Sequence, residues 1–144
     1  MKQIKIAVVD DSKAYLKIMN ILLTNLGEDR NVDLNLNFFA SPLEYKINNS
    51  TFDIVILDYI FYQFPSNLNG FNLDKTTKIK NSSTKVIINT SYENEEILHL
   101  ANEYKDFIDK MSNKEESSGN ELDIVNKVSN LIDEILEIEN KIKW

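Results

Sequence analysis

The sequence contains no cysteine, a single histidine and only three glycines among its 144 residues. The absence of cysteine excludes disulfide bonds, thiolate metal sites and a cysteine nucleophile. The one histidine, His99, excludes a histidine-rich zinc site. The isolated glycines, Gly27, Gly70 and Gly119, cannot form a GxGxxG or Walker A phosphate-binding loop. Nothing in the composition therefore points to a nucleotide-binding loop or to a zinc enzyme.

Basic side chains are also scarce, with 16 against 23 acidic ones and a net charge of −7. This balance argues against general binding to nucleic-acid phosphates. The first apolar run, Ile4–Val9, is too short for a signal sequence or a membrane span. We therefore expect a cytoplasmic protein with no membrane segment. The length fits one domain over residues 1–144.

Short apolar runs alternate with amphipathic stretches along the chain, which indicates alternating strands and helices. The expected strands are 4–9, 32–39, 52–57, 85–89 and 106–108. The expected helices are 13–26, 42–48, 71–80, 93–104 and 122–142. Five strands alternating with five helices predict an α/β doubly wound fold, a parallel sheet with helices on both faces.

Three local features complete this prediction. Gly27 is expected to end the first long helix in the left-handed conformation. Residues 112–120 are polar and are expected to form a loop. The long C-terminal helix, about 120–142, carries one apolar stripe roughly 33 Å long. It is either a slightly overlong packing helix or one whose end overhangs and pairs with a second copy or a partner.

Polar residues follow the predicted strands directly. Asp10 and Asp11 follow the first strand, Asp58 the third, Thr90 the fourth and Lys110 the fifth. Because the carboxyl ends of parallel strands share one edge of the sheet, where ligands bind in such folds, we expect these side chains to converge. The sequence thus predicts a single polar site.

The residue types of this cluster indicate its chemistry. Three carboxylates held together repel one another, and a divalent cation removes that conflict. Ligands that are all oxygen atoms select a hard ion, and few protein ligands favour Mg²⁺. With the ammonium of Lys110 and the hydroxyl of Thr90, the cluster suits a phosphoryl group, which one carboxylate can attack to form an acyl phosphate.

These motifs together resemble the receiver domain of response regulators in two-component signal transduction. The resemblance covers about residues 3–142 and rests on Asp10-Asp11, Asp58, Thr90-Ser91 and Phe107-Ile108-Asp109-Lys110. It implies a flavodoxin-like fold with strand order 2-1-3-4-5 and a stand-alone receiver.

The resemblance also implies a role for each site residue. Asp58 accepts a phosphoryl group from a sensor histidine kinase or a phosphotransfer protein. Asp11 and Asp58 bind Mg²⁺ with the backbone carbonyl of Ile60, and Asp10 assists. Thr90 and Lys110 hold the phosphoryl oxygens. The chain would then catalyse only its own phosphorylation and dephosphorylation.

The implied output is a change in a protein–protein surface. In the family, the residue matched by Thr90 moves inward and the aromatic matched by Phe107 changes rotamer. Both movements rearrange the face formed by the fourth helix, the fifth strand and the fifth helix. That face would contact a downstream protein or a second copy of the chain.

One departure from the family leaves an alternative open. Met111 follows Lys110 where the family has a proline in a cis bond, so we expect a trans bond or a rearranged loop here. The departure suggests, as the alternative, a degenerate receiver that docks partners without phosphorylation. A phosphatase of the haloacid dehalogenase type would need a second aspartate two residues after Asp58, where the chain has Ile60.

Overall fold

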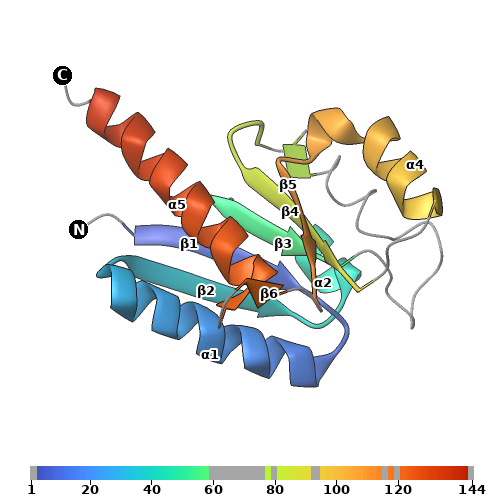
Figure 1. The fold of residues 1–144 in the computed structure, drawn as a ribbon, viewed down its shortest axis with the longest axis horizontal. Helices are drawn as coiled ribbons and strands as arrows, with labels where there is room; N and C mark the ends of the chain where they lie inside the picture. The colour runs from blue at the N-terminus through green and yellow to red at the C-terminus, as the bar shows by residue number, and fades with distance from the viewer. Residues whose placement is uncertain are drawn as a thin grey trace.

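Five parallel strands form one sheet in the order β2-β1-β3-β4-β5 (Figure 1). The computed structural model describes residues 3–58, 77–78, 81–91, 95–114, 117–118 and 121–142. The strands are β1 (Gln3–Val9), β2 (Asp33–Phe39), β3 (Ile54–Leu57), β4 (Lys85–Thr90) and β5 (Lys110–Asn113). The predicted parallel sheet and its strand order are confirmed.

Helices pack on both faces of this sheet. They are α1 (Lys13–Arg30), α2 (Pro42–Ile47), α4 (Glu95–Glu103) and α5 (Asp123–Ile142). α1 and α5 pack on one face, and α2 and α4 on the other. Four helices are described where five were predicted. Of the helix predicted at 71–80, Thr77 and Lys78 are helical, and its other residues lie outside the described part of the chain.

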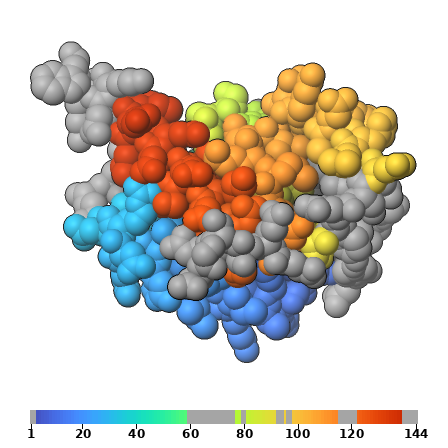
Figure 2. All heavy atoms as spheres, viewed as in Figure 1, coloured from blue at the N-terminus to red at the C-terminus, as the bar shows by residue number. Residues whose placement is uncertain are grey.

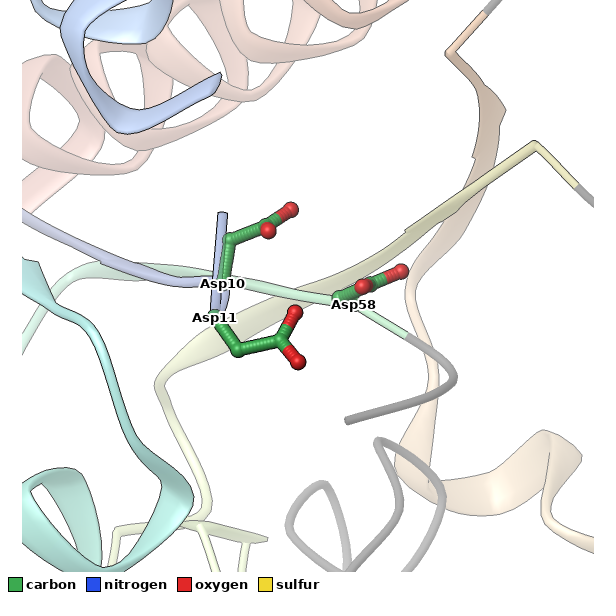
Figure 3. A group of neighbouring side chains, drawn as sticks. All are labelled: Asp10, Asp11 and Asp58. Carbon is green, nitrogen blue, oxygen red and sulfur yellow. The ribbon is translucent and has the colours of Figure 1, made fainter. Parts of the chain in front are cut away.

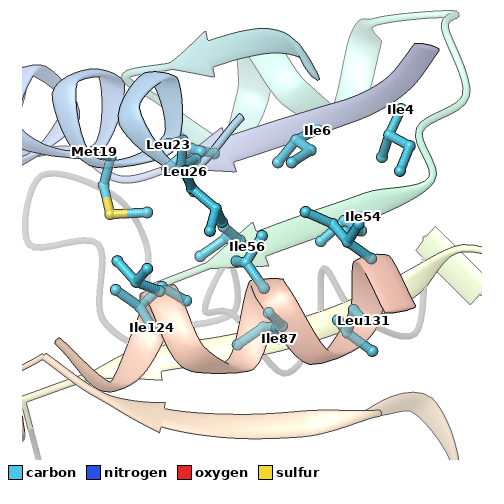
Figure 4. Close-up of a cluster of buried hydrophobic side chains, with 14 of the residues drawn as sticks. Ile4, Ile6, Met19, Leu23, Leu26, Ile54, Ile56, Ile87, Ile124 and Leu131 are labelled. Carbon is cyan, nitrogen blue, oxygen red and sulfur yellow. The ribbon is translucent and has the colours of Figure 1, made fainter. Parts of the chain in front are cut away.

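The core between the sheet and the α1–α5 layer is built from the apolar strands. All four residues of β3 are buried. The side chains that meet in this layer include Ile4, Ile6, Met19, Leu23, Leu26, Ile54, Ile56, Ile87, Ile124 and Leu131 (Figure 4). Central strands of a parallel sheet are buried on both faces, which is why they read as unbroken apolar runs. This packing holds the carboxyl ends of β1, β3 and β4 in place.

The helix α1 runs past the glycine that was expected to end it. Gly27 is buried inside the helix, and Asn31 takes the left-handed conformation at the C-terminus, with φ 52°. A Cβ added at Gly27 would lie 3.1 Å from the carbonyl oxygen of Val32 and 3.3 Å from Leu34. The glycine therefore permits the close approach of α1 to β2, and the prediction that it ends the helix is wrong.

The fifth strand lies later in the chain than expected. Residues 106–108 do not form a strand, because Lys105–Phe107 form a 3₁₀ helix (η1) that follows α4. The strand β5 is Lys110–Asn113, and it pairs with β4 so that Lys110 lies beside Ile87 and Asn113 beside Thr90. Just before β5, the backbone N–H of Val86 on β4 donates to the Asp109 carboxylate at 2.7 Å. This contact helps to set the register of β5.

The described residues of the segment expected to be a polar loop, 112–114 and 117–118, are mostly in strands. Its first residues belong to β5, and Ser117–Ser118 (β6) pairs with Glu121–Leu122 (β7) in a small antiparallel hairpin. α5 then begins at Asp123, whose carboxylate accepts the backbone N–H of Asn113 at 3.2 Å. The expectation of a loop over 112–120 is therefore wrong for its first residues, which carry part of the site.

α5 packs against α1 and β5. Figure 2 shows its red surface next to the orange surface, to which β5 belongs. Its apolar stripe is buried through Ile132, whereas the side chain of Ile138 is 50% exposed. The stripe thus leaves the core toward the end of the helix. Neither α5 nor any other described helix is both long and apolar enough to span a membrane.

Tyr45 on α2 gives the fold a dependence on alkaline pH. Burial raises the pKa of Tyr45 above its usual 10.0, although a hydrogen bond with Thr77 opposes this. The unfolded chain therefore loses this proton at a lower pH, and the contribution to stability is complete below about pH 10 and lost as pH rises further. We expect the free energy of unfolding above pH 10 to fall more steeply in the wild type than in Tyr45→Phe. Denaturant titrations across this range measure the two slopes, and equal slopes would contradict the expectation.

Candidate functional site

Three carboxylates meet where β1 and β3 end. Val9 and Leu57, the last residues of the two strands, lie side by side in the sheet. Asp10 and Asp11 follow the first of them and Asp58 the second, and one carboxylate oxygen from each lies within 4.8 Å of the other two (Figure 3). The predicted convergence of these three residues at the sheet edge is confirmed.

The sheet backbone positions two of these carboxylates. The N–H of Asp10 donates to the carbonyl of Phe39 at 3.1 Å, and the N–H of Asp58 donates to that of Val9 at 3.1 Å. The Asp10 carboxylate also accepts the N–H of Ser12 at 2.9 Å. Asp10 and Asp58 are buried, with 3% and 7% of their surface exposed. The two carboxylates are therefore held in a setting where their charges need compensation.

Lys114 provides part of that compensation. Its Nζ lies 2.6 Å from Oδ2 of Asp10 and 3.3 Å from Oδ1 of Asp58. Its backbone N–H donates to the carbonyl of Thr90 at 3.0 Å, which extends the pairing of β4 with β5 by one residue. Burial alone lowers the pKa of Lys114, but the charges of Asp58 and Asp10 outweigh that effect and raise it. The ammonium of the site is thus Lys114.

The prediction that Lys110 occupies this position is wrong. Lys110 begins β5 instead of following it, and it lies beside Ile87, three residues before Thr90. At about 3.3 Å per residue, this places Lys110 roughly 10 Å from the carboxyl edge of the sheet. Its Nζ lies 3.8 Å from Oε1 of Glu134 on α5. Two lysines, Lys110 and Lys114, stand four residues apart in the sequence. The register of β5 places Lys114, and not Lys110, at the site.

The register of β5 changes two further expectations. Phe107 lies in η1, half-buried, with its ring centroid 6.4 Å from that of Tyr104, so the expectation that it lies on the fifth strand is wrong. The residue three before the site lysine is Met111, which packs on the core between the sheet and α4. The bond between Lys110 and Met111 is trans, as expected. Glu115, and not proline, follows Lys114 in the sequence.

The remaining predicted residues are Thr90 and Ile60. Thr90 ends β4 at the carboxyl edge of the sheet and is 3% exposed. It is thus at the expected edge. Ile60, expected to offer its backbone carbonyl to a metal ion, lies outside the described residues.

Tyr15, in the helix expected at 13–26, was not among the predicted site residues, but it belongs to the site. The Nζ of Lys114 lies 4.4 Å from the centroid of the Tyr15 ring, a cation–π contact. The Tyr15 hydroxyl accepts a hydrogen bond from Nδ2 of Asn89 at 2.7 Å. Burial raises the pKa of Tyr15, and Asn89 and Lys114 oppose that effect. The sequence signal that could have identified Tyr15 is its position in the first turn of α1, a few residues after Asp10 and Asp11.

The donor set of the three carboxylates fits a divalent cation. Their oxygens belong to Asp10, Asp11 and Asp58, so three negative charges lie together, and the Lys114 ammonium contacts two of the three carboxylates. Oxygen ligands without nitrogen or sulfur suit a hard ion such as Mg²⁺. The arrangement can therefore bind a cation and place it beside Asp58.

Comparison with known proteins supports the fold. No protein-family model matches the sequence, and no curated protein matches it. The BeF3-activated receiver domain of DrrB has a TM-score of 0.72 at 21% identity, over 92% of this chain and 99% of that one. A response regulator receiver domain protein from Clostridium thermocellum gives 0.70 at 19%, over 94% and 98%. A CheY-like receiver domain protein from Methanospirillum hungatei JF-1 gives 0.66 at 20%, over 97% and 98%. The chain has the fold of response-regulator receiver domains.

Proposed function

From this receiver fold, we propose that the chain is a phosphorelay signalling domain that accepts a phosphoryl group on Asp58 in a Mg²⁺-dependent reaction. The observation that carries the proposal is the set of charges that the described residues place around Asp58. Three carboxylates and the Lys114 ammonium, contributed by three different strand ends, meet at one edge of the sheet. A charge set of this kind suits the transfer of a phosphoryl group to a carboxylate.

In the proposed reaction, an oxygen of the Asp58 carboxylate attacks phosphorus. The new P–O bond forms as the bond from phosphorus to the donor breaks, and the donor atom leaves with the electron pair and takes up a proton. The Lys114 ammonium, 3.3 Å from Oδ1 of Asp58, stabilises the charge on the phosphoryl oxygens. The Thr90 hydroxyl donates a hydrogen bond to another of these oxygens. The chain catalyses only its own phosphorylation and dephosphorylation.

The residues that would hold Mg²⁺ are Asp11 and Asp58 directly, with Asp10 in support. The backbone carbonyl of Ile60 remains an expected ligand. Bound Mg²⁺ would supply positive charge to the transferring phosphoryl group. Asp10 already accepts hydrogen bonds from the Ser12 backbone N–H and the Lys114 ammonium, which suits a supporting role.

We propose a sensor histidine kinase or a phosphotransfer protein as the donor, in the cytoplasm. The output is a change in the face formed by α4, β5 and α5, which contacts a downstream protein or a second copy of the chain. Thr90 and the β5 residues next to it would begin that change. Because Met111 and not Phe107 lies three residues before Lys114, a side chain without a ring occupies the place of the expected switch aromatic.

The proposal is tested by incubating the protein with acetyl phosphate and Mg²⁺ and measuring its intact mass. We expect the wild type to gain one phosphoryl group and Asp58→Asn to gain none. Asp33→Asn, a change at an exposed carboxylate on β2, is the matched control and should behave like the wild type. A wild type that binds Mg²⁺ but gains no mass would contradict the proposal. It would favour the degenerate receiver that docks partners without phosphorylation.

A further inference from the structure

Polar side chains are buried beneath the acidic cluster, on the side of the sheet that faces α1 and α5. Asn89 on β4 and Ser112 on β5 are neighbours in the sheet and are 2% and 4% exposed. Most side chains packed in this layer are apolar. A pair of buried polar side chains in such a layer therefore needs a physical reason.

The stability of the fold does not explain why these two polar side chains are buried. Oδ1 of Asn89 and Oγ of Ser112 are buried and have no hydrogen-bond partner among the described residues. Leaving a buried polar atom unpaired costs stability, and a valine at position 89 would avoid that cost. Asn89 does make one bond, from its Nδ2 to the Tyr15 hydroxyl at 2.7 Å. The hydrogen bond to Tyr15 is therefore the contribution that can explain a buried amide at position 89.

Tyr15 in turn restricts the site lysine. The Lys114 ammonium lies between the carboxylates of Asp10 and Asp58 and the face of the Tyr15 ring. A lysine side chain has four flexible torsions, and an ion pair alone leaves it free to rotate toward solvent. A ring that packs against the ammonium removes those conformations. The ring keeps the charge within reach of Asp58.

We propose that Tyr15 is a positioning residue for Lys114 and that Asn89 holds the Tyr15 ring in place. The effect on phosphoryl transfer rests on the proposed function, but the placement of Lys114 does not. Asn89, Tyr15 and Lys114 form one chain of contacts from the carboxyl end of β4 to the proposed phosphorylation site. The buried amide thus serves the site at the expense of stability.

Three variants separate the parts of this chain of contacts. Tyr15→Phe keeps the ring and removes the hydroxyl, whereas Tyr15→Leu removes both. Asn89→Val removes the amide that holds the hydroxyl. Tyr45→Leu is the matched control, because Tyr45 is also half-buried with a hydroxyl bonded to one side chain, Thr77, but packs on the opposite face of the sheet.

The first measurement is the NMR chemical shift of the Lys114 side-chain methylene protons next to Nζ, in the metal-free protein. The ring should move these resonances upfield in the wild type and in Tyr45→Leu, and by a smaller amount in Tyr15→Phe, whose ring has lost its bond to Asn89. Tyr15→Leu should return them to the position of an exposed lysine. An unchanged Lys114 shift in Tyr15→Leu would overturn the proposal, whatever the phosphorylation result.

The second measurement is the rate of Asp58 phosphorylation by acetyl phosphate. We expect Tyr15→Leu to be slower by about fivefold, the effect of one cation–π contact, and Asn89→Val to be slower by about twofold. In the Tyr15→Phe background, where no hydroxyl is left without its partner, Asn89→Val should also raise the unfolding temperature, because it removes a half-satisfied buried amide. A purely structural role for Asn89 would not combine higher stability with a slower reaction.

The two proposals can fail separately. A wild type that shows the upfield Lys114 shift but is not phosphorylated would overturn the proposed function and leave the positioning role standing. A phosphorylated wild type whose rate is equally reduced by Tyr15→Leu and Tyr45→Leu would overturn the positioning role alone. Equal rates in Asn89→Val and the wild type would overturn the part assigned to Asn89.

Discussion

Replacing Lys114 by glutamine will slow the phosphorylation of Asp58 by about a hundredfold, whereas the same change at Lys110 will leave the rate close to that of the wild type. The loss of one preorganised positive group at a transferring phosphoryl typically has an effect of this size. Lys114 lies 3.3 Å from Asp58, whereas Lys110 pairs with Glu134 on α5. Time courses of intact mass with acetyl phosphate and Mg²⁺ give the three rates directly.

The two lysine variants control for one another, since each removes one charge from the same short strand region. Mg²⁺ should bind Lys114→Gln at least as tightly as the wild type, because the variant leaves the three carboxylates with one fewer competing cation nearby. If Lys114→Gln binds Mg²⁺ tightly but is phosphorylated slowly, its metal site is intact and it lacks only the ammonium that stabilises the phosphoryl oxygens. A slow Lys110→Gln with a normal Lys114→Gln would contradict the placement of both lysines.

The sheet and the acidic cluster could be predicted from the sequence because both depend on strong local signals. Apolar runs such as Ile54–Leu57 are short, unbroken and followed at once by Asp58. In a parallel sheet such runs must be central strands, and their carboxyl ends must share an edge. The three aspartates therefore follow from topology, and no detail of side-chain packing was needed.

The site lysine could not be predicted because β5 has little hydrophobic signal. Its four residues, Lys110–Asn113, include one strongly apolar side chain, Met111. The preceding Phe107 and Ile108 gave a stronger strand signal but lie in and just after a 3₁₀ helix. The register depends on long-range contacts, those of Val86 with Asp109 and of Lys114 with the aspartates. Such contacts between distant segments do not appear as periodicity in a sequence.

Tyr15 was missed for a different reason. The spacing of the apolar residues in α1 predicts that Tyr15 faces the core, and the structure does pack it there. A tyrosine, however, has an apolar ring and a polar hydroxyl, so one residue can serve the core and the site together. Hydrophobic periodicity reports only the first of these roles. The amide of Asn89, buried in a strand, was the clue that the ring has a second one.

Magnesium will reverse the order of stability between the wild type and Asp11→Asn. Without Mg²⁺, the variant should be the more stable protein, because it removes one of three negative charges that repel one another in the cluster of Asp10, Asp11 and Asp58. At Mg²⁺ concentrations about 100 times the dissociation constant of the wild type, binding adds about 2.7 kcal/mol to the free energy of unfolding. For a domain of this size that is a rise of roughly 5–10 °C in Tm.

Thermal unfolding in EDTA and in a Mg²⁺ series measures both effects, with Asp33→Asn as the control carboxylate. Asp11→Asn should show less than about a third of the Mg²⁺-dependent rise of the wild type, because Asp10 and Asp58, the two carboxylates that remain, already contact Lys114. An equal rise in both proteins would show that Mg²⁺ stabilises the fold elsewhere. A reversal of order separates a metal ligand from a structural aspartate, because loss of a structural hydrogen bond lowers stability with and without the ion.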